Sequence, residues 1–464
     1  MPMNPADLSA CALVAAYAKG ELSPVEALEA VISRAERLEP QLMALWALDV
    51  EGARATAQDS EARWRKGAPL GPIDGVPLTI KENIATRGVA MPLGTAASDL
   101  TAATVDAPPA ARSRESGAVI FARTTMPDYG MLSSSKSSFH KLTRNPWDLT
   151  KTPGGSSAGA GAAAAAGYGP LHIGTDIGGS VRLPAGWCGV FTLKPSLGRI
   201  PIDPPFQGRV AGPMTRTVAD SALFMQVLSL PDARDHMSLP YEAIAWSALD
   251  REVKGLRIGL HLDAGAGLPV EPEVRAAVEA AAHAFEAAGA IVEPLAPFLT
   301  REMLDGQDRF WRARAYADVS GLPEARKAKI LPFIRSWAES AAPFSGQDVY
   351  SGFAQSMALR KATEAATRDF DYVLSPTAPI PAFDAELPGP TNDPEKPFEH
   401  IAFTLPYNMS EQPAASINCG YTSRGLPIGL QIAGRRFDDL GVLQVSRAWE
   451  RMRPQQSAWP FAAA

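Results

Sequence analysis

The sequence predicts an α/β fold in which helices cover a β-sheet. Short apolar runs of the kind found in buried strands alternate with helical stretches along the chain. The pattern is clearest over residues 256–292, where a strand, an alanine-rich helix and a second strand follow one another. This order is typical of layered α/β sheets and not of helix bundles or β-sandwiches. No Gly/Ser-rich or charged linker divides the chain, so we expect one domain over residues 1–464.

The N-terminal residues 1–66 are predicted to be helical. Ser23 and Pro24 form an N-cap followed by proline at the first helical position. Apolar residues then recur at helical spacing, and a second helix is expected over about 51–66. The apolar residues of the first helix are Val25, Leu28, Val31, Ile32 and Leu38.

The next part of the chain contains short strands and one unusual helix. A strand over residues 76–80 delivers Lys81 and Asn83 to its far end, and residues 119–121 form another strand. The run of alanine and glycine over 158–166 predicts a tightly packed, buried helix. A strand over 171–174 then leads into a glycine-rich turn that ends at Ser180.

The second half repeats the alternation of strands and helices. Strands are predicted over 256–260, 291–292 and 372–374, with a helix over 272–288 that ends before Gly289. Residues 299–370 are predicted to be helical, and the Pro-, Asp- and Glu-rich residues 378–400 are predicted to form a surface loop.

Composition and charge exclude several classes of protein. The 44 basic and 50 acidic residues give a net charge of −6, which argues against a general nucleic-acid-binding surface. No apolar run reaches membrane-spanning length and no signal-peptide pattern is present, so we expect a cytoplasmic protein. The three scattered cysteines and six histidines lack the spacing of a metal site. We therefore expect neither a metal nor a cofactor.

Two glycine-rich turns each allow two interpretations. The turn Gly154–Ser157 leads into a helix and could cradle a phosphate, but the sequence lacks both GxxxxGK[ST] and a suitable GxGxxG. A tight turn into a packed helix explains its glycines but not its two serines. The turn Gly178–Ser180 could point several backbone N–H groups at a developing oxyanion, or it could be a plain turn.

Lys81 also has two possible roles. A lone lysine is usually a solvated charge. Burial can instead lower its pKa toward neutrality, so that the amine acts as a general base. A serine nucleophile needs such a base. The few histidines form no triad motif, which makes Lys81 the natural candidate.

Together these segments resemble the amidase signature family, the Ser-Ser-Lys hydrolases. The strongest match is TPGGSSAGAGAAAAAGYGPLHIGTDIGGSVRLPAGWCGVFTLKPS over residues 152–196. GPIDGVPLTIKEN, LTRNPWD, AGPMTRTVAD and GLPIGLQIAGRRFDD, at 71–83, 142–148, 211–220 and 425–439, are also similar to blocks of the family. The resemblance covers most of the chain except about 225–370.

The resemblance assigns a catalytic role to three residues. Ser180 would be the nucleophile, Lys81 the base, and Ser156 the serine that bridges them after a cis peptide bond to Gly155. The oxyanion hole would be formed by the backbone N–H groups of Ile177, Gly178, Gly179 and Ser180. Supporting or substrate-contacting roles would fall to Ser157, Thr175, Asp176 and Arg182.

The resemblance also implies a fold, namely one α/β/α domain around a mixed, twisted central sheet. Residues 1–66 would be the N-terminal helices, 67–225 the signature core, and 300–400 a variable region that includes the substrate pocket. Six aromatic residues in this region could line an apolar pocket or belong to the helical core. They are Phe310, Trp311, Tyr316, Phe333, Trp337 and Phe344.

The activity implied is hydrolysis of a carboxylic amide through an acyl-enzyme, without cofactor, by a monomer or homodimer. We expect a small-molecule substrate, a linear amide with a bulky or aryl group, or else an aryl carbamate or ester. Alternatives are a glutamine-dependent amidotransferase subunit that needs a partner, or a catalytically silent scaffold homologue. The amidotransferase is less favoured because residues 204–208 (PPFQG) replace its serine- and Asp-Gln-containing stretch. Lys136, Ser137 and Glu411 also depart from the family pattern.

Overall fold

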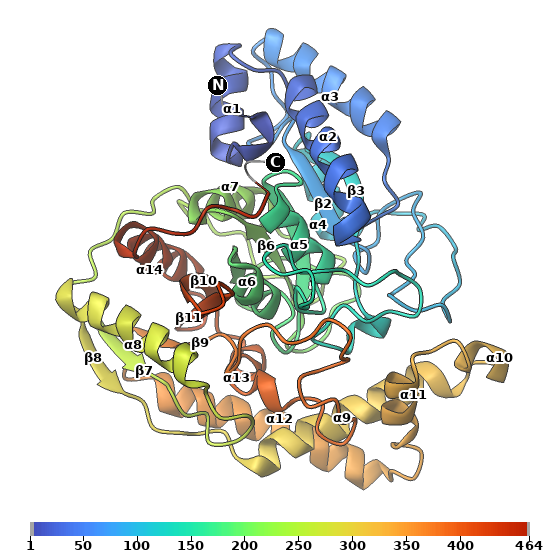
Figure 1. Ribbon diagram of the computed structural model, residues 1–464, viewed down its shortest axis with the longest axis vertical. Helices are drawn as coiled ribbons and strands as arrows, with labels where there is room; N and C mark the ends of the chain where they lie inside the picture. The colour runs from blue at the N-terminus through green and yellow to red at the C-terminus, as the bar shows by residue number, and fades with distance from the viewer. Residues whose placement is uncertain (1–3, 462–464) are drawn as a thin grey trace.

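The computed structural model describes residues 4–461, and its centre is one mixed 11-stranded sheet (Figure 1). The strands are β1 (Leu45–Trp46), β2 (Pro77–Lys81), β3 (Val119–Thr124), β4 (Leu171–Asp176), β5 (Phe191–Lys194), β6 (Val210–Thr215), β7 (Arg257–Leu260), β8 (Ile291–Pro294), β9 (Tyr372–Pro376), β10 (Ala414–Tyr421) and β11 (Pro427–Gly434). Their spatial order is β1-β3-β2-β4-β6-β5-β10-β11-β9-β7-β8. Parallel pairs of β2 with β3 and β4, and of β7 with β8 and β9, flank an antiparallel middle. The mixed sheet expected from the sequence is confirmed.

Helices cover both faces of this sheet. They are α1 (Ala10–Lys19), α2 (Pro24–Leu42), α3 (Val50–Arg65), α4 (Pro108–Glu115), α5 (Ala158–Ala166), α6 (Arg182–Cys188), α7 (Val218–Leu228), α8 (Pro272–Ala287), α9 (Arg301–Ser320), α10 (Glu324–Lys327), α11 (Pro332–Glu339), α12 (Gly346–Thr367), α13 (Leu405–Met409) and α14 (Asp439–Met452). Alternate residues of one strand point to opposite faces. Tyr372 and Leu374 of β9 pack in the cluster with α7, α8 and α14, whereas Val373 packs with Tyr407 of α13. The sheet is therefore the middle of three layers.

The expected helices and most expected strands form close to their predicted bounds. Helix α2 begins at Ser23, whose hydroxyl accepts a hydrogen bond from the N–H of Glu26 while the Glu26 carboxylate accepts one from the N–H of Ser23. Strand β2 ends at Lys81, as predicted. Strands β1, β5, β6, β10 and β11 and helices α4, α6, α7, α13 and α14 were not predicted, and β1 lies within residues 1–66, which were expected to be helical. Helix α6 has seven residues, includes Pro184 and Gly186, and is buried throughout, so it lacks the amphipathic pattern that reveals longer helices.

A second apolar cluster lies outside the sheet, around α9, α11 and α12. These long helices extend along one side of the molecule, away from the N-terminal α1, α2 and α3 (Figure 1). The loop 378–400 is not a simple surface loop as predicted, because Phe398 is 9% exposed and its ring packs edge-on against Trp311 at 5.0 Å. The loop instead joins α9 to the region around Ser180. That residues 1–464 form a single domain, divided into N-terminal helices at 1–66, a core at 67–225 and a variable pocket region at 300–400, stays a prediction.

Candidate active site

Two parallel strands bring the predicted base and the nucleophile loop to one edge of the sheet. Strand β2 pairs in parallel with β4, and Ile80 lies opposite Ile173. The carboxyl ends of parallel strands meet at the same edge, where α/β proteins place their sites. Lys81 therefore lies beside Thr175, and the turn that follows β4 contains Ser180.

Lys81 is completely buried and surrounded by hydroxyl groups. Its Nζ lies 2.8 Å from Ser156 Oγ, 3.1 Å from Ser157 Oγ and 3.0 Å from Thr175 Oγ1. Burial and, to a smaller extent, the positive charge of Arg209 lower the pKa of Lys81 to about 7. A neutral amine is thus available near pH 7, which is the state that a general base requires.

The serines reach Lys81 from the turn before α5. The peptide bond between Gly155 and Ser156 is cis, as the family resemblance implied. The N–H of Ser157 donates to the Ser180 carbonyl at 3.1 Å, which ties this turn to the loop after β4. Ser156 and Ser180 both line the same cleft. The structure thus brings Lys81, Ser156 and Ser180 together.

The backbone N–H groups around Ser180 divide into two sets. The N–H of Gly179 donates to Asp176 Oδ1 at 2.8 Å, so it is already engaged. Among residues 4–461, no acceptor is found for the N–H groups of Ile177, Gly178 and Ser180. The carboxylate of Asp176 thus occupies one of the four amides that the resemblance assigns to the oxyanion hole, and the role of the other three stays a prediction.

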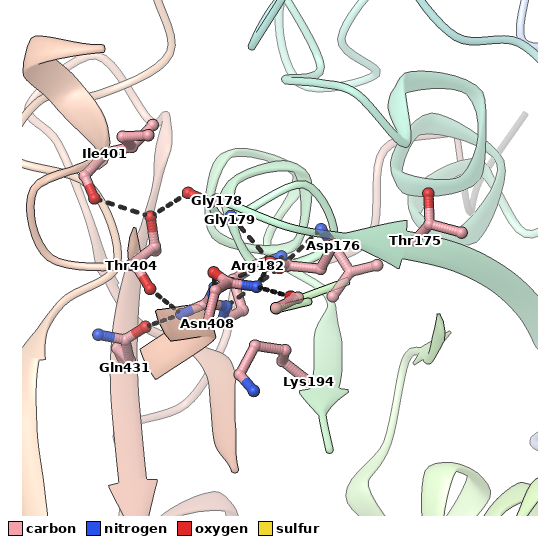
Figure 2. Close-up of polar contacts among 12 residues, drawn as sticks. Thr175, Asp176, Gly178, Gly179, Arg182, Lys194, Ile401, Thr404, Asn408 and Gln431 are labelled. Carbon is pink, nitrogen blue, oxygen red and sulfur yellow. Dashed lines mark hydrogen bonds and ion pairs between the residues drawn. The ribbon is translucent and has the colours of Figure 1, made fainter. Parts of the chain in front are cut away.

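Arg182 lies under the site and is fully buried. Figure 2 shows it at the centre of a network of polar contacts that joins Asp176 to two distant segments. Its guanidinium contacts Asp176 at 2.9 Å, the Thr404 carbonyl and Gln431 Oε1 at 2.8 Å, and Asn408 Oδ1 at 2.5 Å. All of these partners belong to the protein and Arg182 is not exposed to the cleft, so its contacts are structural.

The network also sets the charge of Asp176. Burial alone would raise the pKa of this carboxyl, but the Arg182 charge and hydrogen bonds from Arg182 and Asn408 hold that pKa well below its usual range. Asp176 is thus an anion that accepts from the N–H groups of Gly179 and Val181, at 2.8 Å and 3.1 Å. It fixes the loop that contains Ser180.

Two hollows meet at Ser180. The larger is a cleft of about 500 Å³ that also includes Asn83, Tyr129 and Phe206. The smaller, of about 30 Å³, is lined largely by apolar side chains, among them Trp311, Phe398 and Ile401. An apolar cavity of roughly 150 Å³ holds benzene, so the larger cleft has room for a bulky group, whereas the smaller hollow offers only an apolar contact at Trp311.

The six aromatic residues of the variable region have different positions. Trp311 lines the smaller hollow, and Phe310 stacks on Phe206, a residue of the cleft wall, with ring centres 6.5 Å apart. Trp337 is 2% exposed and packs in the core around α9 and α11. Phe333 also packs against that core, and Phe344 lines a separate surface hollow. Tyr316 is half-buried and lines neither hollow at Ser180, so of the six only Trp311 reaches the hollow beside the nucleophile.

Glu411 departs from the family pattern at a position that explains the usual glycine. Its φ is +64°, in the left-handed region that favours glycine. Its carboxylate pairs with Arg360 at 2.6 Å and with Arg436 at 2.5 Å. These two ion pairs stabilise the Glu411 side chain at a position whose backbone conformation favours glycine.

Sequence reasoning missed five residues of the site. Thr404, Asn408 and Gln431 belong to the network around Arg182, and Arg209 and Arg314 line the cleft. Arg314 lies in the part of the chain without resemblance to the family. Thr404 and Asn408 are more than 220 residues from Arg182, so no local pattern could connect them.

The part of the chain that the structure describes contains neither a candidate metal site nor a candidate membrane-spanning helix. Within residues 4–461, no group of three or more His, Cys, Asp and Glu side chains could hold a metal ion. In the same range, no helix has the length and apolarity needed to cross a membrane.

The fold and site define a class of hydrolase, and comparison with known proteins identifies the family. The amidase family model matches residues 26–443, and the chain belongs to the amidase family. The chain is 33% identical over 488 residues to a glutamyl-tRNA(Gln) amidotransferase subunit from Myxococcus xanthus, covering 97% of this chain and 98% of that relative.

Solved structures give the same family and a different activity. A bacterial aryl acylamidase of the amidase signature family superposes with a TM-score of 0.89 at 31% identity, covering 97% of this chain and 96% of that one. A 6-aminohexanoate cyclic dimer hydrolase has a TM-score of 0.87 at 26% identity, covering 98% of this chain and 99% of the other. The relatives thus include both amide hydrolases and subunits of amidotransferases.

Proposed function

We propose that this chain is a stand-alone amidase that hydrolyses bulky or aryl amides through Ser180, Ser156 and Lys81. The observation that carries the proposal is the contact of the buried Lys81 amine with Ser156, at 2.8 Å, beside a cleft that Ser180 also lines. Aryl carbamates and esters fit the same chemistry. We also propose that the protein is a cytoplasmic monomer or homodimer, as expected from its sequence.

The attack step begins with neutral Lys81. Its amine accepts the proton of Ser156, which accepts the proton of Ser180 as Ser180 Oγ bonds to the substrate carbonyl carbon. The carbonyl electron pair moves onto oxygen, where the N–H groups of Ile177, Gly178 and Ser180 would stabilise the negative charge.

The same relay then runs backward to release the amine. The tetrahedral intermediate collapses, the C–N bond breaks, and the leaving nitrogen takes a proton from Ser156, which regains one from Lys81. An ester of Ser180 remains. Water attacks this ester by the same proton route and releases the carboxylic acid.

The aryl preference rests on the apolar side chains that the cleft presents beside Ser180, at the smaller hollow. Trp311 and Phe398 line it, and the two rings pack edge-on at 5.0 Å. Such a surface favours flat apolar groups. The structural similarity to an aryl acylamidase supports the same class of substrate.

A direct test compares three substrates: a short primary amide, a nitroanilide and an aryl carbamate. Hydrolysis by the purified chain would be measured with Ser180→Ala as the blank. We expect the nitroanilide to be cleaved fastest, with kcat/KM at least tenfold above that of the primary amide. A preference for the primary amide would contradict the aryl proposal but not the amidase proposal.

The second candidate is an amidotransferase subunit, which the 33% identity to such a protein favours. Against it, Pro204, Pro205 and Phe206 form a wall of the cleft in place of the serine- and Asp-Gln-containing stretch that amidotransferase subunits have. The two proposals differ in their need for a partner. Anilide hydrolysis by the single chain supports the first, whereas glutamine hydrolysis that appears only with added partner subunits supports the second.

A further inference from the structure

The larger cleft has a charged wall that the proposed relay does not use. Arg209, from the loop before β6, and Arg314, from α9, both line the cleft that contains Ser156 and Ser180. Two carboxylates, Asp203 and Asp318, line it as well. With Asp176, five charged groups thus line the space beside the nucleophile, and the other four come from two segments far apart in the chain.

Neither arginine has a carboxylate partner. Among residues 4–461, no carboxylate oxygen lies within 4.0 Å of either guanidinium. Arg209 donates to the Pro204 carbonyl at 3.1 Å, and the Arg314 guanidinium lies over the Phe206 ring at 4.8 Å. By contrast, Arg301 and Arg312 of the same helix α9 pair with carboxylates at 2.7 Å. The hydrogen-bonding edges of the two cleft arginines are therefore available to a ligand.

The two guanidiniums are also poorly solvated and close enough to repel each other. Burial and, to a smaller extent, the charge of Arg314 lower the pKa of Arg209 to about 10. Burial lowers the pKa of Arg314 as well. Asp203 and Asp318 offset part of this repulsion, because the Asp203 charge raises the pKa of Arg209 and the Asp318 charge raises that of Arg314, although neither carboxylate forms an ion pair with its arginine. A ligand carboxylate that hydrogen-bonds to both guanidiniums would approach them more closely than Asp203 and Asp318 do, and would therefore relieve their repulsion further.

We propose that the substrate carries a carboxylate that the guanidiniums of Arg209 and Arg314 bind. The proposal rests on the proposed function, because it takes this cleft as the substrate site. An arginine presents a planar array of donors that matches a carboxylate, and a partly buried guanidinium binds it more strongly than one in water. The carboxylate can belong to the acyl half or to the amine half of the amide, and the test separates the two.

The experiment measures binding to the full-length Ser180→Ala chain by calorimetry, with matched charged and neutral amides. For the acyl half, the mono-para-nitroanilide of succinic acid is compared with pentanoyl-para-nitroanilide. For the amine half, butyryl-para-aminobenzoate is compared with butyryl-para-nitroanilide. In at least one pair we expect the carboxylate to bind at least tenfold more tightly, with a preference that falls as salt is added.

Variants assign that preference to the arginines. Arg209→Met and Arg314→Met are each expected to reduce the ratio of charged to neutral affinity at least fivefold, and Arg314→Lys to restore part of it. Arg309→Met is the matched control, because it removes a charge from the same helix at a residue that lines a different hollow. Circular dichroism checks that each variant is folded.

Each outcome separates this inference from the proposed function. Equal or weaker binding of the carboxylate in both pairs, or a preference that survives both methionine variants, overturns the inference. Tighter binding of an ammonium analogue, such as the para-nitroanilide of γ-aminobutyrate, also overturns it. Arginine-dependent binding supports the inference even if the wild-type chain hydrolyses no amide, a result that would count against the proposed function alone.

Discussion

When the chain folds, the Lys81 amine is removed from water and forms hydrogen bonds with three hydroxyl groups. An ammonium group in such a place is poorly solvated, so burial lowers its pKa from 10.5 to about 7. The prediction that this lysine lies at the end of a buried strand is confirmed. No pattern in the sequence indicated Arg209, whose charge also lowers the pKa and whose position depends on the tertiary fold.

The pH dependence of activity follows from the pKa of Lys81. We expect kcat/KM for an uncharged anilide to rise with pH, with a midpoint near 7, because the amine accepts a proton only when it is neutral. A steady-state pH profile measures this. A profile that stays flat from pH 5 to about 9 would contradict the assignment of Lys81 as base.

Lys81→Met is expected to lower kcat by about 10²–10⁴-fold, the range that a general base contributes. The same variant tests whether the lowered pKa of Lys81 makes the free energy of unfolding depend on pH. Between pH 7 and 10.5 the unfolded chain holds more protons at Lys81 than the folded chain does, so the free energy of unfolding of the wild type rises with pH across that window.

Urea unfolding at several pH values measures how the free energy of unfolding depends on pH in the wild type and in Lys81→Met. The contribution of Lys81 to the rise with pH should be missing in the variant. A variant that keeps full activity would refute the role of Lys81, and an unchanged pH slope would refute its lowered pKa.

At the scale of elements, the loop between β4 and α6 is held from the far side of the site. Thr404, which precedes α13, donates its hydroxyl to the Gly178 carbonyl at 2.6 Å (Figure 2). Gly179 has φ +128°, and an added Cβ would lie 2.5 Å from Thr404 Oγ1. The glycines of this turn could be identified from the sequence, but the threonine that positions them could not. It lies 226 residues away from Gly178.

Thr404→Val removes this hydrogen bond and keeps the shape of the side chain. We expect kcat to fall about tenfold with a smaller change in KM, because the N–H groups that face the oxyanion lose their alignment. Thr404→Ser retains the hydroxyl and is expected to restore most of the activity. Steady-state kinetics of both variants measures the effect, and equal kcat values for valine and wild type would rule out the positioning role.

For the whole molecule, the Arg182 network joins segments that are far apart in the sequence. The guanidinium links Asp176 on β4 to Gln431 on β11 and to Asn408 on α13. The sequence left open whether Arg182 supports the fold or meets the substrate, because both roles suit an arginine after the nucleophile. Its complete burial and five protein acceptor atoms answer the question in favour of the fold.

Arg182→Met is expected to lower the free energy of unfolding by about 3–5 kcal/mol, because it leaves Asp176 as a buried, unpaired anion. Denaturant unfolding followed by fluorescence measures this and shows whether the chain unfolds in one transition, as one domain. Arg257→Met is the control. It breaks a solvent-exposed ion pair with Glu293 and should change the free energy of unfolding far less than Arg182→Met does. Similar losses for both variants would contradict the structural role of Arg182.

The central claim is that Ser180 is the nucleophile, and covalent labelling tests it most directly. The wild-type chain would be treated with a fluorophosphonate, digested and analysed by mass spectrometry, with Ser180→Ala and Lys81→Met in parallel. We predict a single adduct on Ser180, formed more slowly in Lys81→Met and absent in Ser180→Ala. If Ser180 stayed unmodified in excess reagent while the chain still hydrolysed an anilide, the proposed mechanism would be wrong.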